Sequence, residues 1–244
     1  MTTPQPDPAA PRRRLSQADR KESIARAAAK LFAERGFHAT GSRELARVCG
    51  ISEALMFRYF PNKEELWKAA LESSRRNAVA DSLRAIPMRA PSTAGLVELT
   101  WELAEDFTAR GPDERVENRN TIHRMHLRSL AEDGEFARLL TSDLSARMAA
   151  YIADCLAAAR SAGDLDSSPE DDQAAPRFFR LLLFAIGAHV LPEPPVIAAE
   201  GGQAALVESF VRFQLRALGL KPDVIDREIS ALPAARRKAA KPRR

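Results

Sequence analysis

Residues 40–63 have the sequence TGSRELARVCGISEALMFRYFPNK, whose spacing predicts two short helices separated by a sharp turn. The turn falls at residues 49–52, where Gly50 can adopt a positive φ without a steric penalty. Ser52 is suited to cap the helix that follows, because its side-chain oxygen can accept a hydrogen bond from a free backbone N–H. Three bulky side chains recur at i, i+3 and i+4 and predict the inner face of this helix: Met56, Tyr59 and Phe60.

The opposite face of the second helix combines large apolar side chains with an arginine, which is unusual for a helix exposed to water. Its members are Glu53, Ala54, Leu55, Phe57 and Arg58. A helix in the major groove of DNA explains this mixture, because arginine can reach guanine edges or phosphates and apolar groups can contact thymine methyls. Glu53 can accept a hydrogen bond from a cytosine amino group, or it can simply oppose phosphate. A protein–protein contact face is the alternative interpretation of these side chains.

Composition and charge favour a helical protein with two basic ends. The chain has 244 residues, of which 45% are hydrophobic and only 11 are glycine, and this is enough for one large or two small domains. Frequent alanine, leucine, arginine and glutamate favour helices throughout. Residues 1–66 hold 12 Lys/Arg against 8 Asp/Glu, residues 67–218 hold 17 against 22, and residues 219–244 hold 8 against 3. A polyanion is therefore expected to bind at the two ends.

Apolar side chains at helical spacing continue along the chain, without internal repeats, and predict an all-α fold. The predicted helices begin at Ser16 and then cover residues 64–86, 92–110, 114–131, 135–161, 169–191 and 202–218, with a short one near 223–230. Four divisions follow: a disordered basic arm (1–15), a helix-turn-helix unit (16–63), a larger helical domain (64–220) and a basic tail (221–244). The helix-turn-helix unit is small and needs a neighbouring surface to support its core.

The two cysteines, Cys49 and Cys155, lie far apart and show neither metal-binding nor redox spacing. Both fall on apolar helix faces, where a free cysteine behaves as a small hydrophobic side chain. The first residues lack the apolar segment of a signal peptide, and the apolar run at residues 181–191 is too short to span a bilayer. These features predict a soluble, cytoplasmic protein without a membrane partner.

Signals for catalysis are weak, and no catalytic residue is predicted. There is no glycine-rich phosphate loop and no nucleophile elbow, and the carboxylates fall on helix exteriors. His123 and His126 are three residues apart and could bring two nitrogens near one metal ion, but matching cysteines or carboxylates are missing. We therefore expect no metal and no cofactor, and interpret these histidines as pocket residues or as hydrogen-bonded core residues. A helical enzyme remains the third function class, without a constellation to support it.

Four sequence runs occur in a fixed order between residues 20 and 67: I-A-x-A-A-x-x-L-F-A-E-R-G-F-x-A-T, R-E-L-A, C-G-I-S and M-F-R-Y-F-P-N-K-E-E-L. This pattern resembles the DNA-binding domain of the TetR (tetracycline repressor) family of bacterial transcription regulators. The detailed resemblance covers about a fifth of the chain, and the rest matches the layout of six further helices. It implies an N-terminal three-helix DNA-binding domain followed by a C-terminal helical bundle for ligand binding and dimerisation.

The resemblance assigns DNA contacts position by position: Arg43, Glu53, Ala54, Leu55, Phe57, Arg58, Tyr59 and Lys63. Tyr59 and Lys63 match phosphate contacts of the family, and Arg43 matches a position that reaches base or backbone. Leu55 stands where threonine is usual and Phe57 where tyrosine is usual. Both exchanges remove a hydroxyl group, so we expect more apolar contact with DNA at these two positions.

Specific binding requires two recognition helices, because related half-sites lie about 34–36 Å apart on one face of B-DNA. The expected homodimer uses the apolar helices near 169–191 and 202–218, for which simple core packing is the alternative. A small apolar or aromatic effector is expected among Trp101, Met125, His126, Met148, Tyr151 and Phe179, each of which can instead be ordinary core.

The predicted function is that of a ligand-responsive transcription regulator that binds a palindromic operator and is released when the effector shifts the fourth helix. A repressor is expected, although the residues leave the sign of regulation open. The alternative function is a sequence-nonspecific protein that coats the chromosome through its basic ends.

Overall fold

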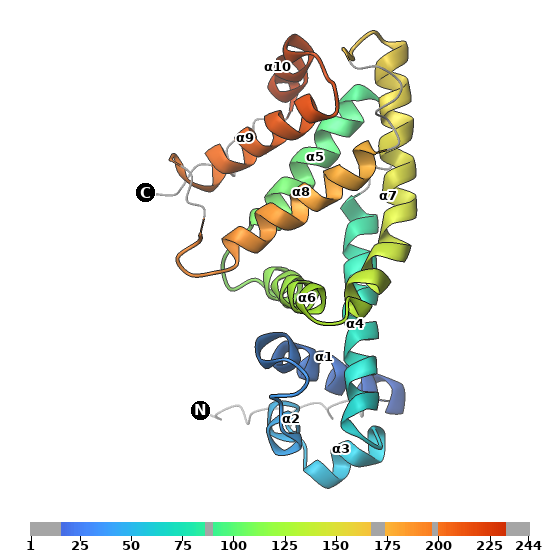
Figure 1. The fold of residues 1–244 in the computed structure, drawn as a ribbon, viewed down its shortest axis with the longest axis vertical. Coiled ribbons are helices and arrows are strands. Elements are labelled where there is room, and N and C mark those ends of the chain that lie inside the picture. The colour runs from blue at the N-terminus through green and yellow to red at the C-terminus, as the bar shows by residue number, and fades with distance from the viewer. Residues whose placement is uncertain (1–15, 86–89, 167–173, 197–199, 233–244) are drawn as a thin grey trace, which may run out of the picture.

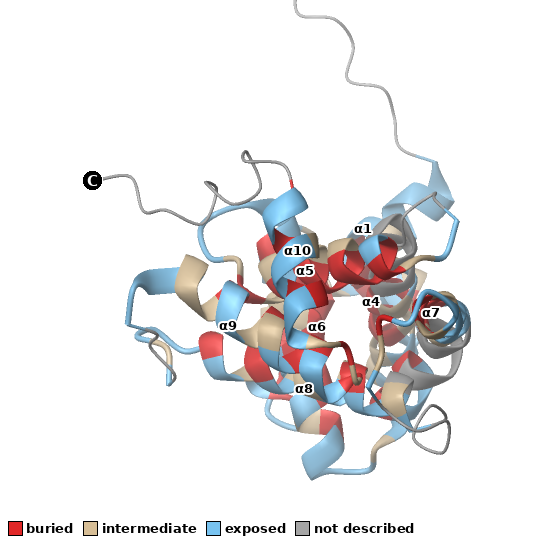
Figure 2. Ribbon diagram, turned by 90° about the horizontal axis from the view of Figure 1, so that it is seen from above, coloured by how far each residue is buried: buried red, intermediate tan, exposed pale blue. Residues whose placement is uncertain are grey.

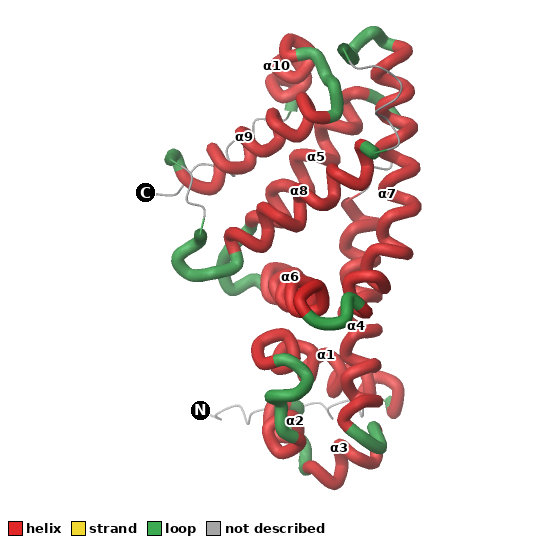
Figure 3. The backbone as a smooth tube through the Cα atoms, in the orientation of Figure 1, coloured by secondary structure: helices red, strands yellow, loops and turns green. Residues whose placement is uncertain are grey.

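A computed structural model describes residues 16–85, 90–166, 174–196 and 200–232. These ranges form ten helices and contain no β-strand, which confirms the predicted all-α fold (Figure 3). The helices are α1 (Gln17–Arg35), α2 (Ser42–Val48), α3 (Glu53–Tyr59), α4 (Lys63–Ala85), α5 (Thr93–Thr108), α6 (Glu114–Ala131), α7 (Glu135–Ser161), α8 (Ala175–Val190), α9 (Gly202–Ala217) and α10 (Pro222–Ala231). None of these helices combines the length and the hydropathy that crossing a bilayer requires.

The helices form two parts that α4 connects. Figure 1 shows α1, α2 and α3 at one end of the molecule, with α4 running from them toward the other helices. Buried positions lie on the inner sides of the helices and exposed positions on the outer sides (Figure 2). The pairing of α1 with α4, and of α5 with α9, α8 and α7, builds this arrangement.

The helix boundaries follow local signals that the sequence predicts. Ser16 and Asp19 form a complete capping box at the start of α1, and the Ser92 side chain accepts a hydrogen bond of 3.0 Å from the backbone of Gly95. The predicted limits of α6 and α7 agree with the structure, and α10 confirms the short helix expected near 223–230. The predicted start of the eighth helix at 169 lies outside the described residues, and α8 is described from Ala175.

The smaller core belongs to the helix-turn-helix part and continues into the rest of the chain. It contains buried side chains of α1 to α4, such as Phe32, Leu45 and Leu66. Ile122 and Met125 of α6 also belong to it, together with Phe136 and Leu140 of α7. The larger helices therefore provide the supporting surface that a three-helix unit of this size needs.

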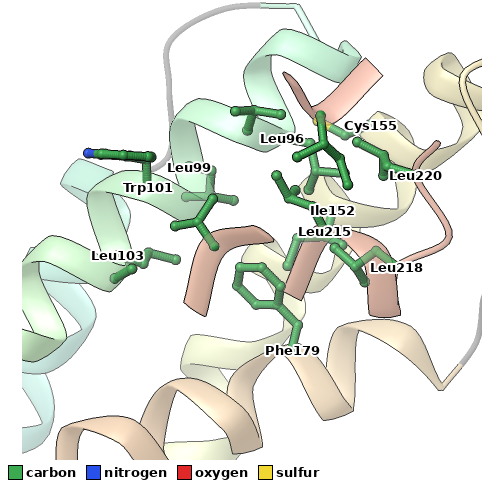
Figure 4. Close-up of a cluster of buried hydrophobic side chains, with 14 of the residues drawn as sticks. Leu96, Leu99, Trp101, Leu103, Ile152, Cys155, Phe179, Leu215, Leu218 and Leu220 are labelled. Atoms are coloured by element: carbon green, nitrogen blue, oxygen red, sulfur yellow. The ribbon is translucent and has the colours of Figure 1, made fainter. Parts of the chain in front are cut away.

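The larger core lies among α5, α7, α8, α9 and α10. Its buried side chains include Leu96, Leu99, Ile152, Phe179 and Leu215, which Figure 4 shows converging from several helices. Val224, Ile225 and Ile229 of α10 are buried in the same cluster. The segment that follows residue 221 thus begins with a packed helix, although its basic end lies outside the described residues.

Candidate nucleic-acid interface

The turn between α2 and α3 has the conformation that the sequence predicts. Gly50 adopts a φ of 65°, in the left-handed region that favours glycine. The backbone N–H of Ile51 donates to the carbonyl of Ala46 at 3.0 Å, which closes the turn. The Ser52 side chain accepts from the backbone N–H of Leu55 at 3.2 Å, so the predicted cap of α3 is confirmed.

The inner side of α3 is anchored by the residues predicted for it. Met56 and Phe60 are buried, and Tyr59 is partly buried against the same core. The ammonium group of Lys21 lies over the Phe60 ring, 5.7 Å from its centroid. This packing fixes the rotation of α3 about its axis and therefore determines which residues face outward.

The outer side of α2 and α3 carries the predicted DNA-contacting side chains. Ala54, Phe57 and Arg58 are exposed, while Glu53 and Leu55 are half-buried. The Arg43 side chain is 96% exposed, and its Nε lies 3.9 Å from a carboxylate oxygen of Glu53. This ion pair links the two helices only weakly, because both partners are open to solvent. Arg43 is therefore able to exchange Glu53 for a phosphate or a base.

Lys63 has structural contacts that the sequence did not indicate. Its ammonium group donates to the carbonyl oxygens of Phe37 at 3.0 Å and Thr40 at 3.2 Å, and lies 4.3 Å from the centroid of the Phe37 ring. These contacts hold the α1–α2 connection against the start of α4. Because an ammonium group has three N–H donors, one remains for the phosphate contact that the family resemblance assigns to Lys63.

The helix-turn-helix part is attached to α6 and α4 by polar contacts as well as by its core. Lys30 of α1 forms an ion pair of 2.5 Å with Glu117 of α6. Arg128 of α6 donates to the carbonyl oxygen of Glu34 at 3.1 Å. The same side chain packs against Gly36, where an added Cβ atom would lie only 2.6 Å from Nη1 of Arg128. Polar contacts also join α1 to α4, so side-chain bonds to both α4 and α6 hold α1 in place.

The six residues predicted to line an effector pocket are all buried: Trp101, Met125, His126, Met148, Tyr151 and Phe179. They do not form one cluster. Trp101, Met148, Tyr151 and Phe179 belong to the larger core, whereas Met125 belongs to the smaller one. Figure 4 shows the Trp101 indole nitrogen pointing away from Phe179 and the central leucines. His126 stacks on the Phe184 ring at a centroid distance of 4.4 Å. The role of His126 in an effector pocket remains a prediction.

Basic side chains lie near His123 and His126, and the sequence did not indicate Arg119 among them. Burial lowers the pKa of His123 to about 3, and the charges of Arg119 and His126 act in the same direction. Burial also lowers the pKa of Arg119, against the opposing influence of Asp106. The pKa of His126 is lowered by burial and then by the charge of Arg180. A single sequence offers no signal for Arg119, because its burial depends on how the end of α5 packs on α6.

The outer surface of α8 and α9 exposes large apolar side chains. Phe178 and Leu181 of α8 are 61% and 56% exposed, and Phe213 of α9 is 60% exposed. Their neighbours Phe179 and Val211 are buried in the larger core. The two helices are therefore apolar on an inner and on an outer side, and the outer side is without an intramolecular role among the described residues.

Comparison with known proteins finds that the N-terminal part is similar to one family. Residues 24–70 match the model described as "Bacterial regulatory proteins, tetR family". The chain is 33% identical over 73 residues to the HTH-type transcriptional activator FasR of Mycolicibacterium smegmatis, and 39% identical over 56 residues to the HTH-type transcriptional regulator LuxR of Vibrio harveyi. These matches cover 30% and 23% of this chain, and they span only 33% and 27% of the two relatives.

Solved structures extend the similarity in fold to most of the chain. AibR, crystallised with isovaleryl coenzyme A and operator DNA, is 17% identical, with a TM-score of 0.57 over 80% of this chain and 97% of that protein. A putative TetR-family transcriptional regulator from Rhodococcus sp. is 22% identical, with a TM-score of 0.59 over 85% of this chain and 98% of that protein. At these identities the comparison establishes a shared helical fold.

Proposed function

We infer that the chain is a ligand-responsive transcription regulator. The premise is that it belongs to the tetR family of bacterial regulatory proteins, whose model matches residues 24–70. The observation that carries this proposal is the exposed face of α3. Phe57 and Arg58 lie on it in contact with solvent, while Met56 and Phe60 hold the helix in place from behind. An apolar ring beside a guanidinium group on an exposed, rigidly anchored helix fits the major groove better than it fits water.

On DNA, the predicted contact residues of α2, α3 and the start of α4 would divide into two roles. Arg43 and Arg58 would contact base edges or phosphates, and Leu55 and Phe57 would contact thymine methyl groups. Tyr59 and Lys63 would bind phosphates and set the position of the protein along the duplex. The predicted contacts of Glu53 and Ala54 complete this surface.

We place the homodimer interface on the outer side of α8 and α9. The exposure of Phe178, Leu181 and Phe213 supports it, since a monomer in water gains nothing from large apolar side chains exposed on two neighbouring helices. A two-fold axis through this face pairs identical surfaces and duplicates the recognition helix. The operator would then contain two related half-sites, about one helical turn of DNA apart.

The effector would act by changing how α4 and α6 hold α1. The ion pair between Lys30 and Glu117 and the bond from Arg128 to Glu34 cross this boundary, so they must adjust when α6 moves. A ligand has this effect only if it binds the DNA-binding and the released conformations with different affinities. We propose that the protein is a repressor, which blocks transcription while it is bound and leaves the operator when the effector binds. The crystals of AibR contain both isovaleryl coenzyme A and operator DNA. This supports the proposal that a protein of this fold can bind a small ligand as well as DNA.

Competition between specific and random DNA tests the proposal. A labelled fragment from upstream of the chain's own gene is titrated with the purified protein, and unlabelled random DNA is then added in large excess. We expect the complex to survive, and Phe57→Ala to weaken it. A complex that random DNA displaces in proportion to its concentration would instead support a chromosome-coating protein, which binds through phosphate contacts alone.

A further inference from the structure

One face of α6 presents three nitrogen-bearing side chains to the interior of the molecule. Arg119, His123 and His126 follow one another at i, i+4 and i+7, a spacing that places them on the same side of a helix. All three are buried, and His123 is only 2% exposed. Basic groups grouped in this way repel one another when charged, so their common position requires an explanation.

His123 is the most deeply buried of the three. Its ring lies 5.0 Å from the Phe107 centroid and 5.3 Å from the Phe184 centroid, and it packs against α8 at Gly187, where a methyl group would overlap it. Neither ring nitrogen has a hydrogen-bond partner among the described residues. Unpaired buried polar groups are rare in native proteins because they lose their bonds to water without replacement.

Arg119 has spare donors beside this histidine. Its Nη2 donates to the carbonyl oxygen of Ala109 at 2.5 Å and to the side-chain oxygen of Asn120 at 3.0 Å, and both acceptors are neutral. Its Nε and Nη1 are buried and have no partner among the described residues. Asp106 influences Arg119 through its charge, and no salt bridge joins the guanidinium group to a carboxylate among the described residues in the paired geometry that arginine favours.

We propose that the effector carries an acidic group, either a carboxylate or a phosphate ester, and that Arg119 and His123 bind its oxygens between α6 and α8. This inference rests on the proposed function, since it presupposes an effector site in the C-terminal domain. The unpaired Nε and Nη1 donors of Arg119 suit a bidentate hydrogen-bonded contact with an oxyanion. Phe107 and Phe184 provide apolar surface for the rest of the ligand. The purely apolar effector expected from the sequence would leave these nitrogens unpaired.

Matched pairs of ligands test the acidic group directly. The full-length chain is screened by ligand-observed NMR against arylalkanoic acids, their primary amides and arylalkyl phosphates of the same length. We expect acids or phosphates to bind at least tenfold more tightly than the corresponding amides. Arg119→Met and His123→Leu should each remove most of this preference. Arg124→Met is the control, because Arg124 is an exposed arginine on the same helix. Arg119→Lys keeps the positive charge and should retain a weaker preference.

Each result has a distinct meaning. Amides that bind as tightly as acids would overturn the acidic group and leave the effector site standing. A preference for acids that neither substitution changes would place their binding elsewhere and overturn the assignment to Arg119 and His123. The failure of every compound to bind would count against the effector site and therefore against both proposals. The ratio of phosphate to carboxylate affinity identifies which acidic group the site favours.

Discussion

Replacing Lys63 by methionine separates its structural contacts from its predicted contact with DNA. Methionine keeps an apolar side chain of similar reach but removes the ammonium group that donates to Phe37 and Thr40. Hydrogen bonds with a charged donor contribute about 1.5–3 kcal/mol each, and an exposed cation–π contact about 0.5–1 kcal/mol. Because Lys63 is only half-buried, solvent screening reduces these values. We expect the free energy of unfolding to fall by about 2 kcal/mol in total.

Urea denaturation of the Lys63→Met variant measures this loss, and Lys68→Met is the matched control. Lys68 lies on the same helix and pairs with Glu65 at the surface, so its removal should change the free energy of unfolding by less than about 0.5 kcal/mol. A loss below that value for Lys63→Met would refute the structural role. Operator affinity at several salt concentrations tests the other role. Losing one phosphate contact from each protomer lowers the slope of log K against log salt by about 1.8, whereas a purely structural loss leaves the slope unchanged.

Three further predictions concern DNA binding, dimerisation and pH. Arg58→Ala should weaken operator binding by more than about 1 kcal/mol in fluorescence anisotropy, and an unchanged affinity would remove Arg58 from the interface. Phe213→Asp should convert the proposed dimer to a folded monomer in analytical ultracentrifugation, because it places a charge on the exposed side of α9. His123 stays neutral in the folded protein down to a pH of about 3, whereas its unfolded pKa is 6.5. The free energy of unfolding should therefore fall by up to about 1.4 kcal/mol per pH unit between pH 6.5 and 3, and His123→Leu should make this dependence shallower.

Local signals made the fold predictable. The position of Gly50, the cap at Ser52 and the inward spacing of Met56 and Phe60 depend on residues a few positions apart, and the structure agrees with each of them. The boundaries of α6 and α7 follow from caps and turn residues in the same way. Such features arise from backbone conformation and from hydrophobic periodicity, both of which one sequence displays.

The candidate sites depend on contacts between distant segments, which periodicity does not reveal. Lys63 bonds to carbonyl oxygens 26 and 23 residues earlier in the chain, and Arg128 contacts a carbonyl 94 residues away. The sequence singles out His123 only by its spacing from His126, and Arg119 looks like an ordinary polar residue of an amphipathic helix. Their burial depends on contacts with segments distant in the sequence: residues 106–109 lie beside Arg119, and α5 and α8 pack against His123. The outward face of α3 could be predicted from the sequence, because it depends only on packing within the short helix-turn-helix part. The contacts of that face with DNA remain predictions.

Selection of DNA sequences from a random pool tests the central claim, that the outer face of α3 recognises a specific operator as part of a dimer. The purified chain is incubated with random duplexes, bound molecules are amplified through several rounds, and the enriched pool is sequenced. We expect one enriched motif with two-fold symmetry and half-sites about one helical turn apart, which Arg58→Ala alters at a defined base position. A pool that remains random although the protein binds it would contradict recognition of a specific operator.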